Sequence, residues 1–285
     1  MKKLLALLLS AMMVLSLAAC GGDTTAEDTA DDTQTEDTGD TTATESDMAY
    51  VQDKGTLVVG ITEFEPMDYQ DADGNWIGFD ADMAKAFAES LGVNVEFQEI
   101  TWDYKVEELD SKAIDCVWNG MTLGEDVMAA MGTSVPYCTN AQVLVVPADK
   151  AADFEGLTSL EGLNVAVESG SAGEDAAIAL GATTVPVQSQ ANTLMEVSAG
   201  TSDAAVIDLL MAGAMIGEGT SYEDLTFTLN LNDAQGLPSE EYGVGFRKGS
   251  DLVDAFNEFW AEKVSDGTVL ETATTYGVQD AVILD

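Results

Sequence analysis

The chain contains no histidine, and its 10 basic residues include a single arginine, Arg247. Histidine is the usual general acid or base near neutral pH and the commonest nitrogen ligand of metals. The chain has only three cysteines, too few to build a sulfur-ligated zinc site. We therefore expect no such metal site, no cofactor, and no catalytic pair of serine or cysteine with histidine.

Positive charge is scarce relative to negative charge, with 52 acidic residues and a formal net charge of −42. Without the two lysines of residues 1–19 and the ten acids of residues 21–47, 8 basic and 42 acidic residues remain. Such a protein is a poor partner for nucleic acid or an anionic membrane surface. Its charge is either a general solubility feature of a secreted protein or a field that favours cationic ligands.

Residues 1–19 combine Lys2 and Lys3 with an apolar run that is too short for a confident membrane span and is typical of a secretory signal peptide. The run ends in "LAAC", which resembles a bacterial lipoprotein signal with cleavage before Cys20 and lipid on that cysteine. The alternative is an ordinary signal peptide with a chance cysteine. We expect an extracytoplasmic protein anchored to the outer face of the cell membrane, within the periplasm if the cell has two membranes.

Residues 20–48 follow as the lipidated cysteine and an acidic, threonine-rich segment that has no basic or aromatic residue from 21 to 47. This composition buries too little apolar surface to offset chain entropy, so it predicts a disordered, extended linker. The folded body is expected to begin near Ala49.

Two cysteines remain in the folded body. Cys116 and Cys138 lie in the short strand-like runs "IDCVW" and "YCTNAQVLVV". In an oxidising compartment they either form one disulfide or remain two buried thiols, because sequence alone does not supply the geometry.

Strand-like and helix-like segments alternate through the body. An apolar run at 56–61 precedes a helix with Asp80 as its expected N-cap, an apolar face at i, i+4 and i+8, and Gly92 after its end. The same alternation restarts near Leu157 and continues to the amphipathic helix at 250–267. Strands that alternate with helices predict an α/β fold with largely parallel sheets, here in two lobes with the chain returning to the first.

Several segments, taken in order, resemble the polar amino acid binding proteins of ABC importers, the extracellular solute-binding protein family 3. They are "KGTLVVGITEFEPMDY", "DGNWIGFDADMAKAFAESLG", "WDYKVEELDSKAIDCVWNGMT", "VPY", "LNVAVESGS", "SDAAVID" and "EYGVGFRKGSDL". The resemblance implies a two-lobed Venus-flytrap fold of the type II periplasmic-binding-protein class, with lobe 1 at 49–140 and 243–285 and lobe 2 at 141–242. It implies two hinge strands near 138–146 and 240–246, a monomer, and ABC permease subunits as partners.

Ligands of open α/β sheets bind at the carboxyl ends of strands, and these ends present candidate site residues. They are Phe64, Trp102, Trp118, Asn119, Gly120, Thr122, Ser171 and Asp208. The resemblance implies that the aromatic residues Phe64 and Trp102 hold the ligand's side chain and that Asp208 receives its ammonium group. Each also has a structural alternative: the aromatic residues as core, Thr122 as a turn residue, and Asp208 as the N-cap of the following helix.

The segment at 119–137 reads as a loop and departs from the family at one position. The resemblance places an arginine five residues after Thr122, where it would bind the ligand's α-carboxylate, but this chain has Val127. It also has Ala172 where a hydroxyl is common, and Arg247 matches a surface position. Loss of the bidentate ion pair makes an ordinary α-amino acid in the family's pose doubtful.

Two kinds of ligand remain open. A cationic or amine-bearing solute would suit Asp208, the aromatic residues and the acidic field, with Tyr104 and Tyr137 as further walls. An amino acid would instead need a new carboxylate anchor at Lys105, Ser171 or the backbone amides of "AGEDAA".

We expect a non-enzymatic receptor that delivers a small polar solute, an amino acid or an amine, to a permease. The alternatives are a lyase or dehydratase on the same fold, for which no acid–base pair stands out beyond Asp208 with Glu63 or Glu65, and a surface sensor.

Overall fold

The structure is a computed structural model, and it describes residues 46–284. The expected signal peptide, Cys20 and nearly all of the expected linker lie outside this range. Helix α1 (Asp47–Lys54) begins the fold, and the Ser46 hydroxyl caps it by accepting a hydrogen bond from the Ala49 amide at 3.0 Å. The folded body therefore starts two residues before Ala49.

The first lobe is built on a six-stranded sheet in the order β4-β1-β5-β13-β6, with β7 also paired to β13. β1 pairs in parallel with β4 and β5, whereas β13 runs antiparallel to β5, β6 and β7. The strands are β1 (Thr56–Ile61), β4 (Asn94–Glu99), β5 (Cys116–Thr122), β6 (Gly132–Thr133), β7 (Cys138–Asn140) and β13 (Glu240–Phe246).

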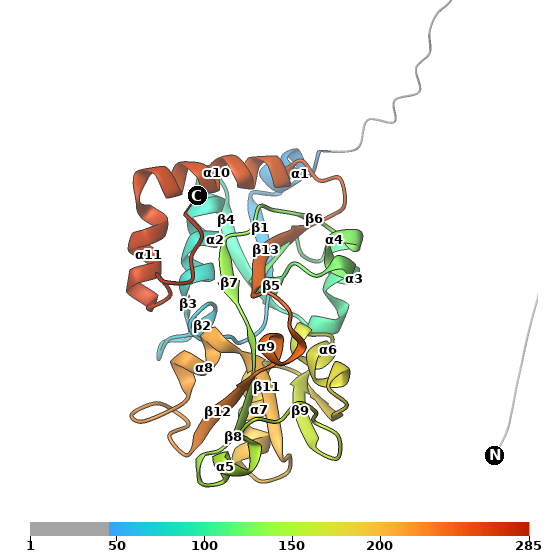
Figure 1. The fold of residues 1–285 in the computed structure, drawn as a ribbon. Coiled ribbons are helices and arrows are strands. Elements are labelled where there is room, and N and C mark those ends of the chain that lie inside the picture. The colour runs from blue at the N-terminus through green and yellow to red at the C-terminus, as the bar shows by residue number, and fades with distance from the viewer. Residues whose placement is uncertain (1–45, 285) are drawn as a thin grey trace, which may run out of the picture. The chain divides into compact units, whose positions relative to one another are not determined.

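Helices on both sides of this sheet follow its strands (Figure 1). They are α2 (Phe79–Ser90), the 3₁₀ turn η1 (Trp102–Tyr104), α3 (Lys105–Asp110), α4 (Glu125–Ala130), α10 (Leu252–Asp266) and α11 (Thr268–Tyr276), and a small hairpin joins β2 (Tyr69–Gln70) to β3 (Trp76–Ile77).

Two local expectations are wrong in this lobe. The N-cap of α2 is Gly78 rather than Asp80, because the buried Asp80 carboxylate turns inward and accepts hydrogen bonds from the Gly120 amide and the Tyr137 hydroxyl. The segment 119–137 is not simply a loop, since its first residues complete β5 and it contains α4 and β6.

The second lobe has a five-stranded sheet in the order β10-β9-β11-β8-β12. Its strands β9 (Asn164–Glu168), β10 (Thr183–Val187) and β11 (Ala204–Asp208) pair in parallel, and β8 (Gln142–Pro147) runs antiparallel to both of its neighbours, β11 and β12 (Leu225–Asn230). The helical segments are η2 (Ala148–Lys150), α5 (Ala151–Phe154), α6 (Ala172–Ala179), α7 (Gln190–Ser198), α8 (Leu209–Met215) and α9 (Leu231–Gln235).

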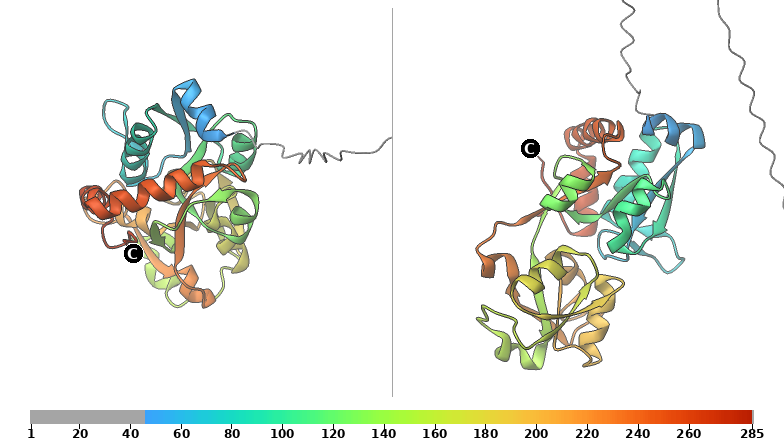
Figure 2. Two further views of the ribbon diagram at one scale, coloured as in Figure 1. Left: turned by 90° about the horizontal axis from the view of Figure 1, so that it is seen from above. Right: turned by 90° about the vertical axis from the view of Figure 1, so that its right-hand side faces the viewer.

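The chain passes between the two sheets twice. It leaves the first sheet between β7 and β8, and it returns between α9 and β13, as Figures 1 and 2 show. β13 belongs to the first sheet from Glu240 onward, three residues before the expected boundary at 243. Two α/β lobes joined by two crossings form the expected Venus-flytrap fold.

Of the two alternatives left open for Cys116 and Cys138, the structure has two buried free thiols and no disulfide between them. The two cysteines lie on strands at opposite edges of β13, where Cys116 pairs with Phe246 and Cys138 with Tyr242. Two strand spacings and four residues of strand separate them by roughly 16 Å, far beyond the reach of a disulfide.

Arg247 is buried rather than at the surface. Its guanidinium contacts the Asp47 carboxylate at 2.9 Å and donates to the Ile114 carbonyl at 2.8 Å. The Asp115 carboxylate lies 3.5 Å from Arg247 and 2.6 Å from Lys54. These contacts attach α1 to the edge of the first sheet.

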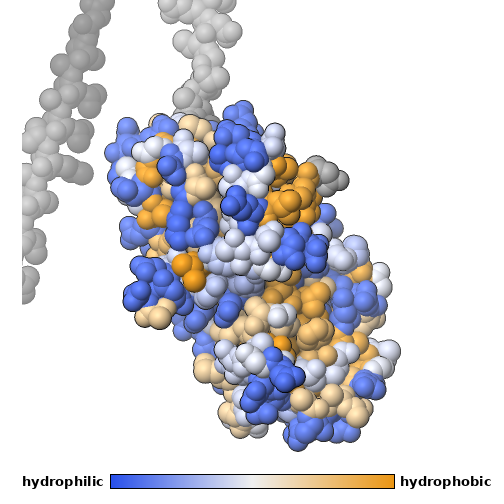
Figure 3. All heavy atoms as spheres, turned by 90° about the vertical axis from the view of Figure 1, so that its left-hand side faces the viewer, coloured by the Kyte–Doolittle hydropathy of each residue, from blue (hydrophilic) through white to orange (hydrophobic). Residues whose placement is uncertain are grey.

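Hydrophilic side chains cover most of the face shown in Figure 3, and apolar ones form smaller patches between them, as is usual for globular proteins. Within residues 46–284, no helix has the length and apolar character needed to cross a membrane.

Candidate ligand-binding site

A cavity of about 320 Å³ lies between the two lobes at the carboxyl ends of β5, β9 and β11. This volume is at the lower end of the range for small-molecule sites. Six of the eight residues predicted from the sequence line it: Trp102, Asn119, Gly120, Thr122, Ser171 and Asp208.

The other two predicted residues, Phe64 and Trp118, are core residues. Trp118 is fully buried and packs against Phe256, with ring centroids 5.0 Å apart. Phe64 lies beneath Gly120, where a Cβ atom would approach its ring within 2.4 Å. For Phe64 the core alternative is therefore correct, and the expectation that Trp118 walls the site is wrong.

Tyr104 and Tyr137, which were expected as further aromatic walls of the site, do not line the cavity either. Tyr137 is also fully buried, and Tyr104 is 56% exposed to solvent. Among the described residues that line the cavity, Trp102 is the sole aromatic one.

Asp208 occupies the N-cap position of α8, but its carboxylate makes no capping hydrogen bond. Its oxygens instead accept hydrogen bonds from the side-chain amides of Gln142 (2.8 Å), Asn140 and Gln190. Burial raises the pKa of Asp208 to about 7, and the negative charge of Glu240 adds to the rise. Asp208 is therefore a desolvated carboxylate on the cavity wall, held in place by amides rather than by a cation.

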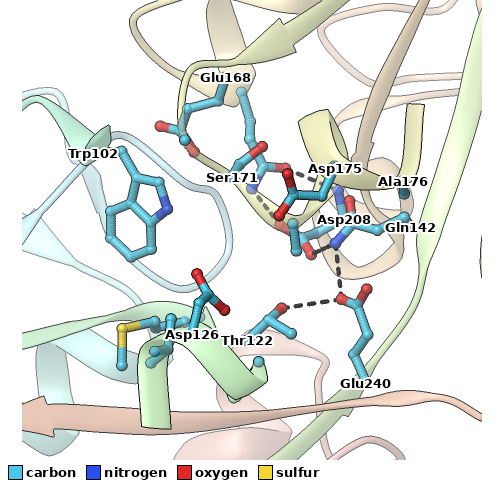
Figure 4. A pocket seen from close by; sticks show the side chains of 18 of the residues that line it. Trp102, Thr122, Asp126, Gln142, Glu168, Ser171, Asp175, Ala176, Asp208 and Glu240 are labelled. Atoms are coloured by element: carbon cyan, nitrogen blue, oxygen red, sulfur yellow. Dashed lines mark hydrogen bonds between the residues drawn. The ribbon is translucent and has the colours of Figure 1, made fainter. Parts of the chain in front are cut away.

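Glu240 is a second carboxylate beside Asp208, and the sequence analysis did not single it out. The Gln142 amide donates to both acids, at 2.8 Å in each case, and the Thr122 hydroxyl donates to Glu240 at 3.0 Å (Figure 4). Thr122 thus contacts a carboxylate and is not merely a turn residue. Glu240 begins β13, where the chain re-enters the first lobe, and only the tertiary structure brings it to Asp208.

Glu168 is a third acid on the cavity wall that the sequence analysis missed. The residue is 2% exposed, and its Oε1 atom has no hydrogen-bond partner. Burial raises the pKa of Glu168 to about 8. Glu168 ends β9 just as Asp208 ends β11, so the rule that pointed to Asp208 applies to Glu168 as well.

Two further acids, Asp126 of α4 and Asp175 of α6, face each other across the cleft. Figure 4 shows their carboxylates at the cavity, with Asp126 between Trp102 and the Asp208 side. Burial raises the pKa of Asp175, and Asp126 contributes through like-charge repulsion.

Lys105 is the single cationic side chain that lines the cavity within the described part of the chain. Its ammonium donates to the carbonyls of Trp102 (3.3 Å) and Gly170 (3.1 Å), and it lies 5.0 Å from the centroid of the Trp102 ring. Burial lowers the pKa of Lys105. Because Gly170 belongs to the second lobe, this side chain also links the two lobes.

The other two alternative carboxylate anchors, Ser171 and the following amides, lie at the start of α6. The Ser171 hydroxyl caps α6 by accepting from the Glu174 amide at 3.1 Å. The Glu174 carboxylate in turn accepts from the Gly170 amide at 2.8 Å. The first contact occupies the Glu174 amide of this helix end, while Ser171 keeps its own O–H as a donor.

Val127 lines the cavity where the resemblance places an arginine. It is 7% exposed and packs in the cluster that contains Trp102, Met121 and Met131. The cavity wall therefore presents five carboxylates and one lysine. No group of three or more side chains between residues 46 and 284 is arranged to hold a metal ion.

Comparison with known proteins decides the family. The model of bacterial extracellular solute-binding proteins, family 3, matches residues 57–279. The chain belongs to this family. Curated relatives of the chain are named for the amino acids that they bind.

Two curated relatives match this chain over nearly their whole length. The arginine-binding extracellular protein ArtP of Bacillus subtilis is 28% identical over 94% of both chains. The L-cystine-binding protein TcyA of Bacillus subtilis is 30% identical, over 98% of this chain and 99% of the relative.

A solved structure confirms the family fold. The ancestral amino acid-binding protein AncCDT-1, a precursor of cyclohexadienyl dehydratase, superposes with a TM-score of 0.71 at 30% identity. The match covers 81% of this chain and 99% of the ancestral protein.

Proposed function

We propose that this protein is the lipid-anchored solute-binding component of an ABC importer and that its cleft binds a small cationic solute, an amine that lacks a carboxylate. The observation that carries the proposal is the cavity wall, on which five carboxylates face one lysine and Val127 replaces the family's arginine. A carboxylate on the ligand would meet repulsion and lack a bidentate partner.

Asp208 is the expected partner of the ligand's ammonium group. Its carboxylate is desolvated and held by neutral amides, so a cationic ligand would supply the counter-charge that the site lacks. The face of Trp102 adds apolar contact and a cation–π attraction of about 0.5 to 2 kcal/mol.

Matched pairs of ligands test this proposal, each pair comprising an amino acid and the amine that remains when its carboxylate is removed. L-phenylalanine with 2-phenylethylamine and L-lysine with 1,5-diaminopentane are suitable, measured by titration calorimetry. We expect at least one amine to bind roughly 10 to 100 times more tightly than its amino acid, because a buried, poorly satisfied carboxylate costs about 1 to 3 kcal/mol.

Val127→Arg is the matched variant for this experiment. It places a guanidinium where the family has one, so it should weaken amine binding and improve amino acid binding relative to wild type. The proposal fails if wild-type protein prefers the amino acid of each pair.

The membrane anchor has a separate test. We propose lipid on Cys20, because small residues precede it and an acidic segment follows. Wild-type protein should partition into detergent and Cys20→Ala should remain in the aqueous phase. Wild-type protein in the aqueous phase, with an unmodified amino terminus, would exclude the anchor.

We propose binding without chemical conversion, in keeping with the curated relatives, which are binding proteins. The likeness to a dehydratase precursor makes a direct check worthwhile. A bound amine recovered unchanged after long incubation would support a receptor, whereas elimination of ammonia or water from it would indicate a lyase.

A further inference from the structure

We propose that the solute carries two cationic groups joined by a short apolar spacer, and that the cleft binds them at two separate acidic ends. One group binds at Asp208 and Glu240, and the other binds between Glu168, Asp126 and the Trp102 ring. This inference rests on the proposed function, which requires only one cationic head.

The first end is closed and desolvated. Asp208 is 4% exposed, and the Gln142 amide holds it next to Glu240. Gln142, Asn140 and Gln190 donate hydrogen bonds here but carry no charge. Two adjacent carboxylates without a cation form a site suited to one ammonium group.

The second end has an independent sign of a missing partner. Glu168 is 98% buried, given its 2% exposure, and its Oε1 is an unpaired acceptor on the cavity wall. Leaving a buried acceptor unpaired is costly, so a ligand that donates to it gains more than it would at a solvated acid. Figure 4 shows Glu168 above the Trp102 ring, on the opposite side of the cavity from Glu240, and Asp126 between the Trp102 ring and Thr122.

Lys105 does not neutralise this second end. Its ammonium already donates to the two carbonyls of Trp102 and Gly170. Asp126 and Asp175 outnumber its single charge even while Glu168 is protonated, so the end keeps an excess of negative charge, and an added cation favours ionised Glu168. The Trp102 ring supplies a surface on which that cation can lie.

The rest of the wall suits a hydrocarbon spacer. Val127, Ala172 and Ala176 line the same cavity, and its volume of about 320 Å³ limits the ligand to a small molecule. The cavity therefore fits a short diamine, or a guanidino-amine of similar length.

The test compares 1,4-diaminobutane with 1-aminobutane, which differ only in the second amino group and one hydrogen. Titration calorimetry on the full folded chain should show that the diamine binds at least about tenfold more tightly. In Glu168→Gln, diamine affinity should fall about tenfold or more, while 1-aminobutane affinity should change less than about twofold. Glu155→Gln removes the same charge from an exposed position of the second lobe and should change neither affinity.

The outcomes distinguish a failure of the two-cation inference from a failure of the proposed function. If 1-aminobutane binds as well as the diamine, or Glu168→Gln weakens both equally, the two-cation inference is wrong and the proposed function stands. If neither amine, nor any other amine, binds, both are wrong. Should Glu168→Gln not fold, Asp126→Asn serves instead, since Asp126 is exposed to solvent and its loss should also reduce the advantage of the diamine.

Discussion

Two sets of buried carboxylates invite comparison, one in the core of the first lobe and one on the cleft wall. In the core, Asp80 accepts from the Gly120 amide and the Tyr137 hydroxyl at 2.7 Å each, and Asp68 accepts from the Asn119 amide at 2.7 Å. Burial raises the pKa of both, as it does for Asp208 and Glu168 in the cleft.

The two sets cannot be told apart by burial or by hydrogen bonding. Asp68 and Asp80 each have a buried oxygen without a partner, and so does Glu168. What differs is that Asp208 and Glu168 line the cavity and the core pair does not. A perturbed acid therefore marks a ligand site only where space for a ligand adjoins it.

The largest expected effect separates the two sets directly. Asp208→Asn should weaken binding of the best amine by about 2 to 5 kcal/mol, because it removes the counter-charge from a desolvated site. Asp80→Asn keeps an acceptor for Gly120 and Tyr137 and should change affinity by less than about 0.5 kcal/mol. Calorimetry on both variants measures the contrast, and similar losses for the two would show that the core pair also shapes binding.

Both the core carboxylates and the cleft carboxylates should contribute to the pH dependence of stability. A carboxyl group with a raised folded-state pKa binds more protons in the folded state than in the unfolded state, so stability is lost as pH rises toward that folded value. Asp80 and Asp208 have a pKa of about 7 and Glu168 of about 8. Without ligand, the free energy of unfolding should fall between pH 5 and pH 8 by more than about 2 kcal/mol.

A cationic ligand should reduce only the cleft's share of that loss, because it stabilises ionised Asp208 and Glu168 and does not reach Asp80. Asp80→Asn should reduce the core's share with or without ligand. Denaturant unfolding across this pH range measures both. A stability that rises steadily from pH 5 to pH 8 would contradict the raised values.

Trp102 at the cleft and Trp118 in the core should respond differently to substitution. Trp102→Ala should weaken amine binding by about 1 to 2 kcal/mol through lost apolar contact and cation–π attraction. Trp118→Phe should instead lower the unfolding temperature and leave affinity unchanged, since Trp118 packs in the core. If Trp102→Ala bound normally, the Trp102 face would not be part of the site.

The smallest effect concerns the two thiols, which belong to the core. A reducing agent should leave the unfolding temperature unchanged within about 1 °C, because Cys116 and Cys138 are free and far apart. Thermal unfolding with and without dithiothreitol measures this. A clear drop on reduction would indicate a disulfide and require a different arrangement of β5, β7 and β13.

The local sequence determined much of this protein. Apolar runs, turn glycines and amphipathic spacing are local properties, and they predicted two α/β lobes and the strand that ends in Asp208. The same pattern placed Trp102, Thr122 and Ser171 on the cleft, because strand ends meet at one edge of a sheet. It also showed Val127 where the family has an arginine.

The tertiary structure alone decided which of these residues a ligand can reach. Phe64 follows β1 but packs beneath Gly120, and Trp118 lies within β5 and packs against Phe256 of α10, so both are core residues. Glu240 lies far from Asp208 in sequence, and the return of the chain to the first lobe brings them together through Gln142. Which face of a strand or helix adjoins a cavity depends on how distant segments pack, and for that reason the acidic character of the cleft became visible only in the folded protein.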